Sequence, residues 1–213
     1  MSIFRNIDGK PVLLRMVKAI QDNKAYLGEV DGLIGDGDHG MNMNKGFSVF
    51  EARFKDKEFT FSEGLEELGM ILLNEIGGSM GPIYGTIFME MAESAKELEN
   101  ISLEDFGKML TAGLEGLYGI VDAKVGDKTL VDTLSPAADT ILAAAKEGSD
   151  YRKALEEMKK AAELGRNSTK DMVAKFGRSS RLGERSRGVL DAGATSCCII
   201  LIAMADEIGE VLV

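Results

Sequence analysis

One short segment, residues 31–40 (DGLIGDGDHG), concentrates three aspartates, four glycines and the only histidine of the chain. Glycines spaced in this way allow backbone conformations that aim side chains inward. Carboxylates gathered on one loop repel one another unless a cation neutralises them. A hard divalent ion such as Mg²⁺ prefers carboxylate oxygens and completes its shell with water and phosphate. The segment therefore predicts a cradle for a metal ion that serves a phosphorylated ligand.

Three other interpretations of this segment explain less of it. The glycine spacing of residues 35–40 matches the dinucleotide fingerprint, but that motif requires a preceding strand, and residues 13–30 have a helical pattern. An EF-hand loop beginning at Asp36 would place Phe47 where a chelating glutamate is needed. A plain helix cap at Asp38 requires one aspartate and leaves the other two unexplained.

Composition limits the classes of function. The 213 residues suit one domain, and the 45% hydrophobic content is enough for a sizeable core. A net charge of −10 argues against a nucleic-acid-binding surface. The adjacent Cys197 and Cys198 lie in an apolar stretch and indicate small buried residues of a reducing compartment. The sequence has no signal peptide and no uninterrupted apolar run of about 18 residues, so we expect no membrane span and a cytoplasmic location.

Helical periodicity extends over nearly the whole chain, and no alternating run of β-branched residues predicts a strand. Asp8 is expected to cap the first helix, and Ser102 with Asp105 resembles a capping box that opens another. We therefore expect an all-α, single-domain fold over residues 1–213, an antiparallel bundle or barrel of about eight helices. One expected helix begins at Pro11 and another at Ser102. The others are expected to span about residues 38–54, 62–76, 82–98, 132–146, 150–175 and 193–212.

Three further loops combine glycine with polar groups. Residues 77–85 (GGSMGPIYG) and 126–130 (GDKTL) each precede a predicted helix, where backbone N–H groups attract anions. Residues 177–187 (GRSSRLGERSR) hold four arginines, followed by Asp191-Ala192-Gly193-Ala194. In an acidic protein such a cluster needs anionic partners. We favour a nucleotide or a protein partner over salt bridges to neighbouring helices.

Together, the four loops resemble the nucleotide-binding L subunit of dihydroxyacetone kinases. The matching stretches are residues 34–44 (IGDGDHGMNMN), 77–85, 126–132 (GDKTLVD) and 177–196 (GRSSRLGERSRGVLDAGATS). They recur in order and cover nearly the whole chain, which makes the resemblance far more specific than any single glycine motif. It implies a barrel of eight antiparallel helices with a nucleotide at one rim, in agreement with the helix pattern.

The resemblance also implies roles for individual residues. In the family, three aspartates hold two Mg²⁺ ions that bridge the phosphates of ADP or ATP; here they correspond to Asp31, Asp36 and Asp38. The implied nucleotide contacts are His39, Gly40, Met41 and Asn42 at a helix start, Gly78, Ser79 and Met80 in the phosphate turn, Leu130 at the adenine, and Arg178, Asp191, Ala192 and Gly193 closing over the nucleotide. His39 would orient a phosphate, and Arg178 would stabilise developing charge.

Two positions depart from the family pattern. Met80 stands where a serine is common, so a side-chain contact to phosphate is lost unless Ser79 substitutes for it. Ala192 replaces a frequent proline, which is expected to loosen the last loop without abolishing binding.

The resemblance further implies that the chain is half of a phosphotransferase. The family attaches its sugar through a histidine of a K-type subunit, and this chain has no second histidine. A stand-alone L chain fits the phosphoenolpyruvate-dependent version best, in which a phosphohistidine on an M-type subunit recharges retained ADP. One alternative is the nucleotide-binding half of an ATP-dependent kinase for dihydroxyacetone, erythrulose or a related ketose. Another is a regulatory or lipid-binding barrel without turnover. A homodimer is also possible.

Overall fold

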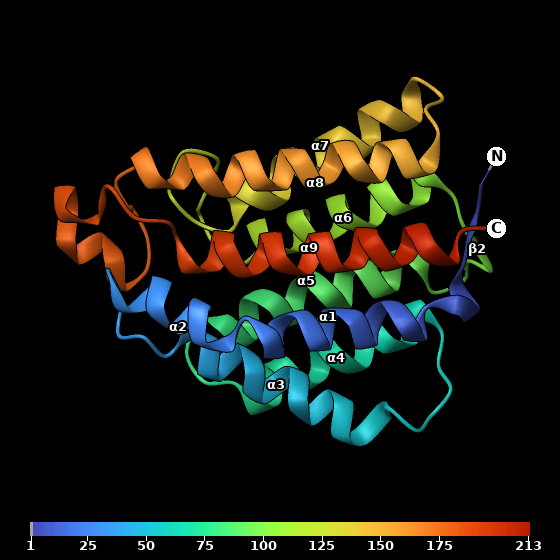
Figure 1. Ribbon diagram of the computed structural model, residues 1–213, viewed down its shortest axis with the longest axis horizontal. Coiled ribbons are helices and arrows are strands. Elements are labelled where there is room, and N and C mark those ends of the chain that lie inside the picture. The colour runs from blue at the N-terminus through green and yellow to red at the C-terminus, as the bar shows by residue number, and fades with distance from the viewer. Residues whose placement is uncertain (1) are drawn as a thin grey trace.

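The computed structural model describes residues 2–213, and its helices run along the long axis of the molecule (Figure 1). Met1, the first residue of the expected domain, lies outside the described residues. The α-helices are α1 (Lys10–Asp22), α2 (Lys24–Gly32), α3 (His39–Phe54), α4 (Phe61–Glu75), α5 (Met80–Ala95), α6 (Leu103–Tyr118), α7 (Val131–Lys146), α8 (Tyr151–Ser168) and α9 (Ala192–Val211). Shorter elements are the strands β1 (Phe4–Arg5) and β2 (Asn100–Ile101) and the 3₁₀ helices η1 (Asn6–Asp8), η2 (Thr169–Asp171) and η3 (Arg178–Ser186).

Eight of these helices form a closed ring. From α3 to α9 each helix packs on the next along the chain, α9 packs on α1, and α1 packs on α3. Helices that are neighbours in the ring run in opposite directions (Figure 1), and the longest connection, from α8 to α9, carries η2 and η3. Large side chains such as Phe47, Phe88 and Phe106 fill the interior and are fully buried. The expected all-α, eight-helix architecture is confirmed.

The helix α2 was not expected as a separate element. The pattern over residues 13–30 predicted one continuous helix, but Asn23 interrupts it, and its side-chain Nδ2 donates to Ala19 O over 2.9 Å. Such local side-chain bonding competes with helix propagation. α2 then packs against α3 so tightly that a Cβ at Gly40 would overlap the Lys24 carbonyl. This contact brings the end of α2 and the start of α3 together.

Two predicted helix starts were wrong. Asp8 does not cap α1, because its carboxylate accepts from Arg5 Nε over 2.6 Å. α4 begins after Thr60 and not at Ser62. Thr60 Oγ1 accepts from Glu63 N, and the Glu63 carboxylate accepts from Thr60 N over 2.7 Å, which is a capping box.

Two other helix ends show where local signals hold and where they fail. Ser102 and Asp105 form the predicted capping box at the start of α6. The helix expected over 150–175 ends at Ser168, because Thr169 Oγ1 bonds back to Arg166 O over 2.6 Å and the chain turns into η2. The arginine-rich loop therefore leaves the barrel earlier than predicted.

One helix, α9, is long and apolar enough by length and composition to cross a membrane. Its most apolar window is 67% buried inside the protein, and the helix packs between α1 and α8. Burial in the barrel wall accounts for its apolar character, since a core helix of a large protein is hydrophobic on most sides.

Candidate nucleotide and metal site

The three aspartates of the glycine-rich segment meet at one end of the barrel. Asp31 lies in the last turn of α2, and Asp36 and Asp38 lie in the loop that leads into α3. One carboxylate oxygen from each lies within 4.8 Å of the others. Gly37, with φ of 77°, provides the left-handed turn between them. The loop thus brings three carboxylate oxygens, the donor type that a hard cation prefers, close to one point.

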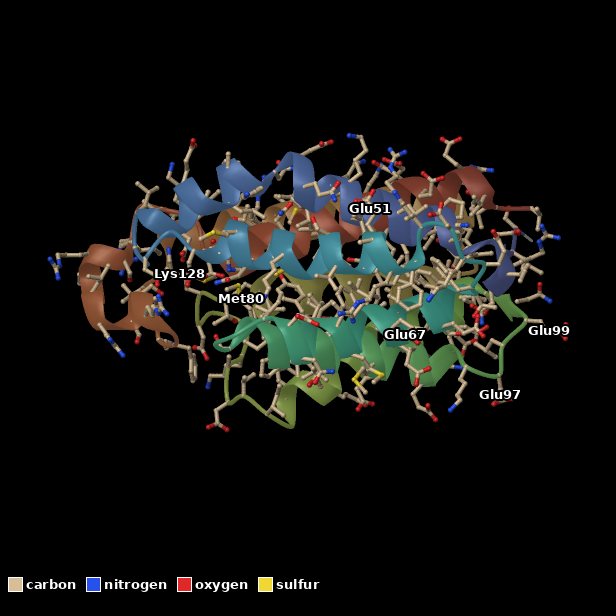
Figure 2. The ribbon with its side chains drawn as sticks, turned by 90° about the horizontal axis from the view of Figure 1, so that it is seen from below. Glu51, Glu67, Met80, Glu97, Glu99 and Lys128 are labelled. Carbon is tan, nitrogen blue, oxygen red and sulfur yellow. The ribbon has the colours of Figure 1, made fainter. Side chains whose placement is uncertain are left out.

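These carboxylates line a pocket of about 740 Å³, within the usual size range of small-molecule sites. Met80 and Lys128, which also line it, mark this end of the barrel in Figure 2. The predicted site residues that line the pocket are Asp31, Asp36, Asp38, His39, Asn42, Gly78, Ser79, Met80, Leu130, Arg178, Asp191, Ala192 and Gly193.

Two predicted nucleotide contacts lie outside this lining. Gly40 is buried against the backbone of α2, and the side chain of Met41 is 58% exposed. Gly40 and Met41 are the first two residues after His39, but successive residues of a helix face different directions. Gly40 therefore serves the α2–α3 contact.

The charges at the pocket mouth suit a hard cation. The guanidinium of Arg178 contacts Asp36 and lies 3.9 Å from Asp38 Oδ2. One arginine against three carboxylates leaves an excess of negative charge, and the donor atoms are all oxygens. That combination fits Mg²⁺ bound through carboxylates and phosphate.

Backbone groups suited to phosphate face the carboxylates from α5. The turn before this helix contains Gly78, with φ of 73°, and Ser79 makes no side-chain cap to the helix. The first N–H groups of α5 therefore have no side-chain partner from Ser79, and such free donors attract anions. Met80 opens the helix and packs partly against the core.

His39 is buried and hydrogen-bonded into the barrel. Its Nε2 lies 2.8 Å from Ser196 Oγ, which lies 2.6 Å from the hydroxyl of Tyr84. Burial lowers the pKa of His39 to about 4, although the nearby Asp31 carboxylate raises it in part. The imidazole is therefore neutral at pH 7, and any hydrogen bond to phosphate must come from an N–H of the neutral ring.

A buried lysine holds the base of the arginine-rich loop. Lys128 is 1% exposed, has a left-handed φ of 61°, and donates from Nζ to Thr169 O over 2.6 Å and to Val189 O over 2.5 Å. These two carbonyls lie on either side of the excursion that carries Arg178. Burial lowers the pKa of Lys128. One ammonium thus ties both stems of the loop to the start of α7.

Asp191 caps α9 at the inner wall of the pocket. Its Oδ2 accepts from Ala194 N over 2.8 Å. Burial raises the pKa of the Asp191 carboxyl to about 6, although the Ala194 N–H and the Lys128 ammonium oppose the shift. Its contribution to the pocket's negative charge therefore depends on pH.

Sequence reasoning missed two residues that line the pocket and one, Ser196, that hydrogen-bonds to pocket residues. Tyr84, Ser196 and Lys128 have no assigned role in the motif analysis, although all three lie inside the matching stretches. Their contacts join segments more than 40 residues apart in the chain. No residue pattern in the sequence marks these contacts, because each depends on the packing of distant segments.

A second hollow, of about 960 Å³, contains none of the predicted residues. It lies between η1, α4 and α5, and Glu97 and Glu99 mark that end of the molecule in Figure 2. The nucleotide-site candidate and this acidic hollow are thus at opposite ends of the barrel.

The fold and the acidic pocket define a class of protein. Residues 33–206 match the DAK2 domain, and the chain belongs to that family. It is 36% identical over 186 residues to the ADP-binding subunit of phosphoenolpyruvate-dependent dihydroxyacetone kinase 1 of Listeria innocua, which covers 87% of this chain and 88% of that subunit. It is 37% identical over 183 residues to the corresponding Escherichia coli K12 subunit, covering 84% of this chain and 86% of that subunit.

The barrel also recurs in a solved kinase. The dihydroxyacetone kinase of C. freundii in complex with AMP-PNP and Mg²⁺ superposes with a TM-score of 0.69 at 21% identity. The match covers 93% of this chain and 33% of that one, so the chain corresponds to about a third of that kinase. At this identity the likeness establishes the common fold.

Proposed function

We propose that the chain is the ADP- and ATP-binding subunit of a phosphoenolpyruvate-dependent dihydroxyacetone kinase. It accepts a phosphoryl group from a phosphohistidine on an M-type subunit and passes it to dihydroxyacetone held by a K-type subunit. The observation that carries this proposal is the trio of carboxylates within 4.8 Å of one another in a pocket that also holds Arg178. The similarity to ADP-binding subunits over nearly their whole length supports it.

The residues of the pocket have different roles toward a bound nucleotide. Asp31, Asp36 and Asp38 would hold Mg²⁺, two ions by the family resemblance, and the metal would supply charge neutralisation for the phosphates. The N–H groups at the start of α5 would bind phosphate oxygens. Leu130 would line the adenine pocket. Arg178, which contacts Asp36 at the pocket mouth, would stabilise charge on the transferring phosphoryl group.

The one histidine of the sequence is poorly placed to hold the sugar covalently. His39 is 7% exposed and its Nε2 is engaged by Ser196. Nε2 is thus unavailable, and the buried ring is not placed to attack a carbonyl substrate held outside the barrel. This supports a separate K-type subunit for the acceptor, which could be dihydroxyacetone or a related ketose in the ATP-dependent alternative.

Retained nucleotide separates the relay from that alternative. The purified chain is desalted, and its bound nucleotide and metal are measured by mass spectrometry and metal analysis. Retained ADP that becomes ATP on addition of a phosphorylated carrier subunit supports the relay. Free exchange of ATP with no response to the carrier favours a kinase that consumes ATP directly.

Site variants test the metal assignment. Asp36→Asn is expected to lower phosphoryl transfer with the partner subunits by about 100-fold or more, because a charged metal ligand is lost. The matched control is Asp56→Asn, because Asp56 is an exposed aspartate just after the C-terminal end of α3. This variant should leave transfer unchanged. Full activity of Asp36→Asn would refute the assignment.

A further inference from the structure

A hydrogen-bonded chain runs from the barrel wall to the phosphate end of the pocket. The hydroxyl of Tyr84 on α5 lies 2.6 Å from Ser196 Oγ on α9, and Ser196 Oγ lies 2.8 Å from Nε2 of His39 on α3. Tyr84 is 3% exposed and Ser196 is fully buried. Gly193 O lies 3.1 Å from Ser196 Oγ and 3.2 Å from the Tyr84 hydroxyl.

The other ring nitrogen of His39 is the one left for a ligand. Among residues 2–213 no protein group hydrogen-bonds Nδ1. The hydroxyl of Tyr151 is the one fully buried side-chain nitrogen or oxygen without a partner in that range, so Nδ1 is not sealed in the core. His39 also lines the pocket. Nδ1 is therefore accessible from the pocket. Whether it carries a proton decides whether it donates a hydrogen bond to a ligand atom or accepts one.

Two proton arrangements satisfy the chain. In the first, the Tyr84 hydroxyl donates to Ser196, Ser196 donates to His39 Nε2, and the neutral ring keeps its proton on Nδ1. In the second, His39 donates from Nε2 to Ser196, and the hydroxyl protons pass on to Gly193 O. The first ring presents a donor to the pocket and the second presents a lone pair.

The distances favour the first arrangement. Hydroxyl hydrogen bonds are usually 2.7–2.8 Å long between oxygens, and both hydroxyl protons then lie in the two shortest contacts of the chain. The second arrangement must place a hydroxyl proton in a contact to Gly193 O of 3.1 or 3.2 Å.

We propose that Tyr84 and Ser196 are positioning residues that keep His39 Nε2 an acceptor and leave the ring proton on Nδ1, so that the ring donates to a phosphate oxygen of the nucleotide. The identity of that acceptor rests on the proposed function, whereas the tautomer does not. An imidazole with a lone pair facing the pocket would repel a phosphate oxygen, so the buried hydroxyls decide whether the ring helps or hinders binding.

The single histidine makes the tautomer directly measurable. In the ¹⁵N-labelled full chain at pH 7.5, long-range ¹⁵N–¹H correlation of the imidazole reports the protonation of each ring nitrogen without nucleotide. We expect Nδ1 protonated and Nε2 unprotonated in the wild type. In Tyr84→Phe, Ser196 can accept from His39 and donate to Gly193 O, so the ring should shift toward Nε2–H.

Affinity for ADP with Mg²⁺ is the second readout, measured by calorimetry. Loss of one supporting hydrogen bond weakens the hold on the ring, so Tyr84→Phe and Ser196→Ala should each weaken ADP binding about tenfold. The matched control is Tyr151→Phe, which removes a buried hydroxyl that has no partner. It should leave both the tautomer and the affinity unchanged.

Each outcome bears on one proposal or the other. A wild-type ring protonated on Nε2, or on both nitrogens, in a chain that binds ADP would overturn this inference alone. A Tyr84→Phe ring that keeps Nδ1–H would also overturn it. An Nδ1–H ring in a chain that binds no ADP would refute the proposed function and the phosphate acceptor, while the role of the two hydroxyls would stand.

Discussion

The guanidinium of Arg178 spans the mouth of the pocket and contacts the carboxylate of Asp36. The two side chains are 59% and 45% exposed, so this ion pair contributes at most about 1 kcal/mol to folding. Its position matters more than its strength, because it engages a carboxylate that the proposed function assigns to Mg²⁺. Arg178 and a metal ion therefore compete for Asp36 when no nucleotide is bound.

Removal of this arginine should have opposite effects on metal binding and on catalysis. In Arg178→Met, Mn²⁺ measured by electron paramagnetic resonance without nucleotide should bind several-fold tighter, because a competing cation is gone. Phosphoryl transfer should fall by about 10³-fold, the scale reported for arginines that stabilise transferring phosphoryl groups. The exposed Arg181 of the same loop provides the control Arg181→Met. Weaker Mn²⁺ binding in Arg178→Met would contradict the competition.

The fit of Asp31 depends on a neighbouring glycine. A methyl group at Gly35 would overlap the Asp31 carboxylate, because Gly35 N bonds back to Asp31 O and the two residues are in close contact. Gly35→Ala should therefore weaken Mg²⁺-dependent ADP binding about tenfold while the barrel stays folded. Gly209→Ala, where nothing lies within 4 Å of the added methyl, is the control and should be neutral or slightly stabilising. Equal affinity in the two variants would count against Asp31 as a ligand.

The parts of the fold that depend on local chemistry were predictable from the sequence. The capping box of Ser102 and Asp105 requires residues only three positions apart, and it begins α6 as expected. The cap at Asp8 failed because a closer competitor, Arg5, takes its carboxylate. The break at Asn23 was missed because the apolar periodicity continues through it into α2. Such choices between competing partners are not visible in a pattern of residue types.

The candidate site also has a part that the sequence predicts and a part that depends on the whole fold. Asp31, Asp36 and Asp38 are close in the sequence, so their meeting could be expected from one loop. The partners of His39 could not, because Ser196 and the helix that carries it are 157 positions away. Their proximity follows from closure of the ring by α9 against α1, a property of the whole barrel.

The lysine at the base of the arginine-rich loop should control how firmly that loop is held. Lys128→Met leaves Thr169 O and Val189 O without their charged donor. A hydrogen bond to a charged group contributes about 1.5–3 kcal/mol to stability. We expect the free energy of unfolding to fall by about 2–3 kcal/mol. Hydrogen exchange over residues 172–188 should rise more than exchange in the barrel.

The exposed Lys170 at the same stem supplies the comparison for this prediction. Lys170→Met removes a lysine of equal charge whose side chain makes no hydrogen bond or ion pair with residues 2–213, and exchange in the loop should stay as in the wild type. Equal protection of the loop in Lys128→Met and Lys170→Met would show that the buried ammonium does not hold the stems.

The raised pKa of Asp191 should appear in the pH dependence of stability. Its carboxyl titrates near 6 in the folded chain and near 3.9 when unfolded, so between these values the native state holds a proton that the unfolded state has released. Stability contributed by Asp191 is therefore lost as pH rises from about 4 to 6. Asp191→Asn keeps a capping side chain and removes the titration. In urea unfolding with EDTA, the free energy of unfolding of the variant should rise relative to that of the wild type by about 1–2 kcal/mol between pH 4 and pH 7. A difference that stays constant with pH would refute the assignment.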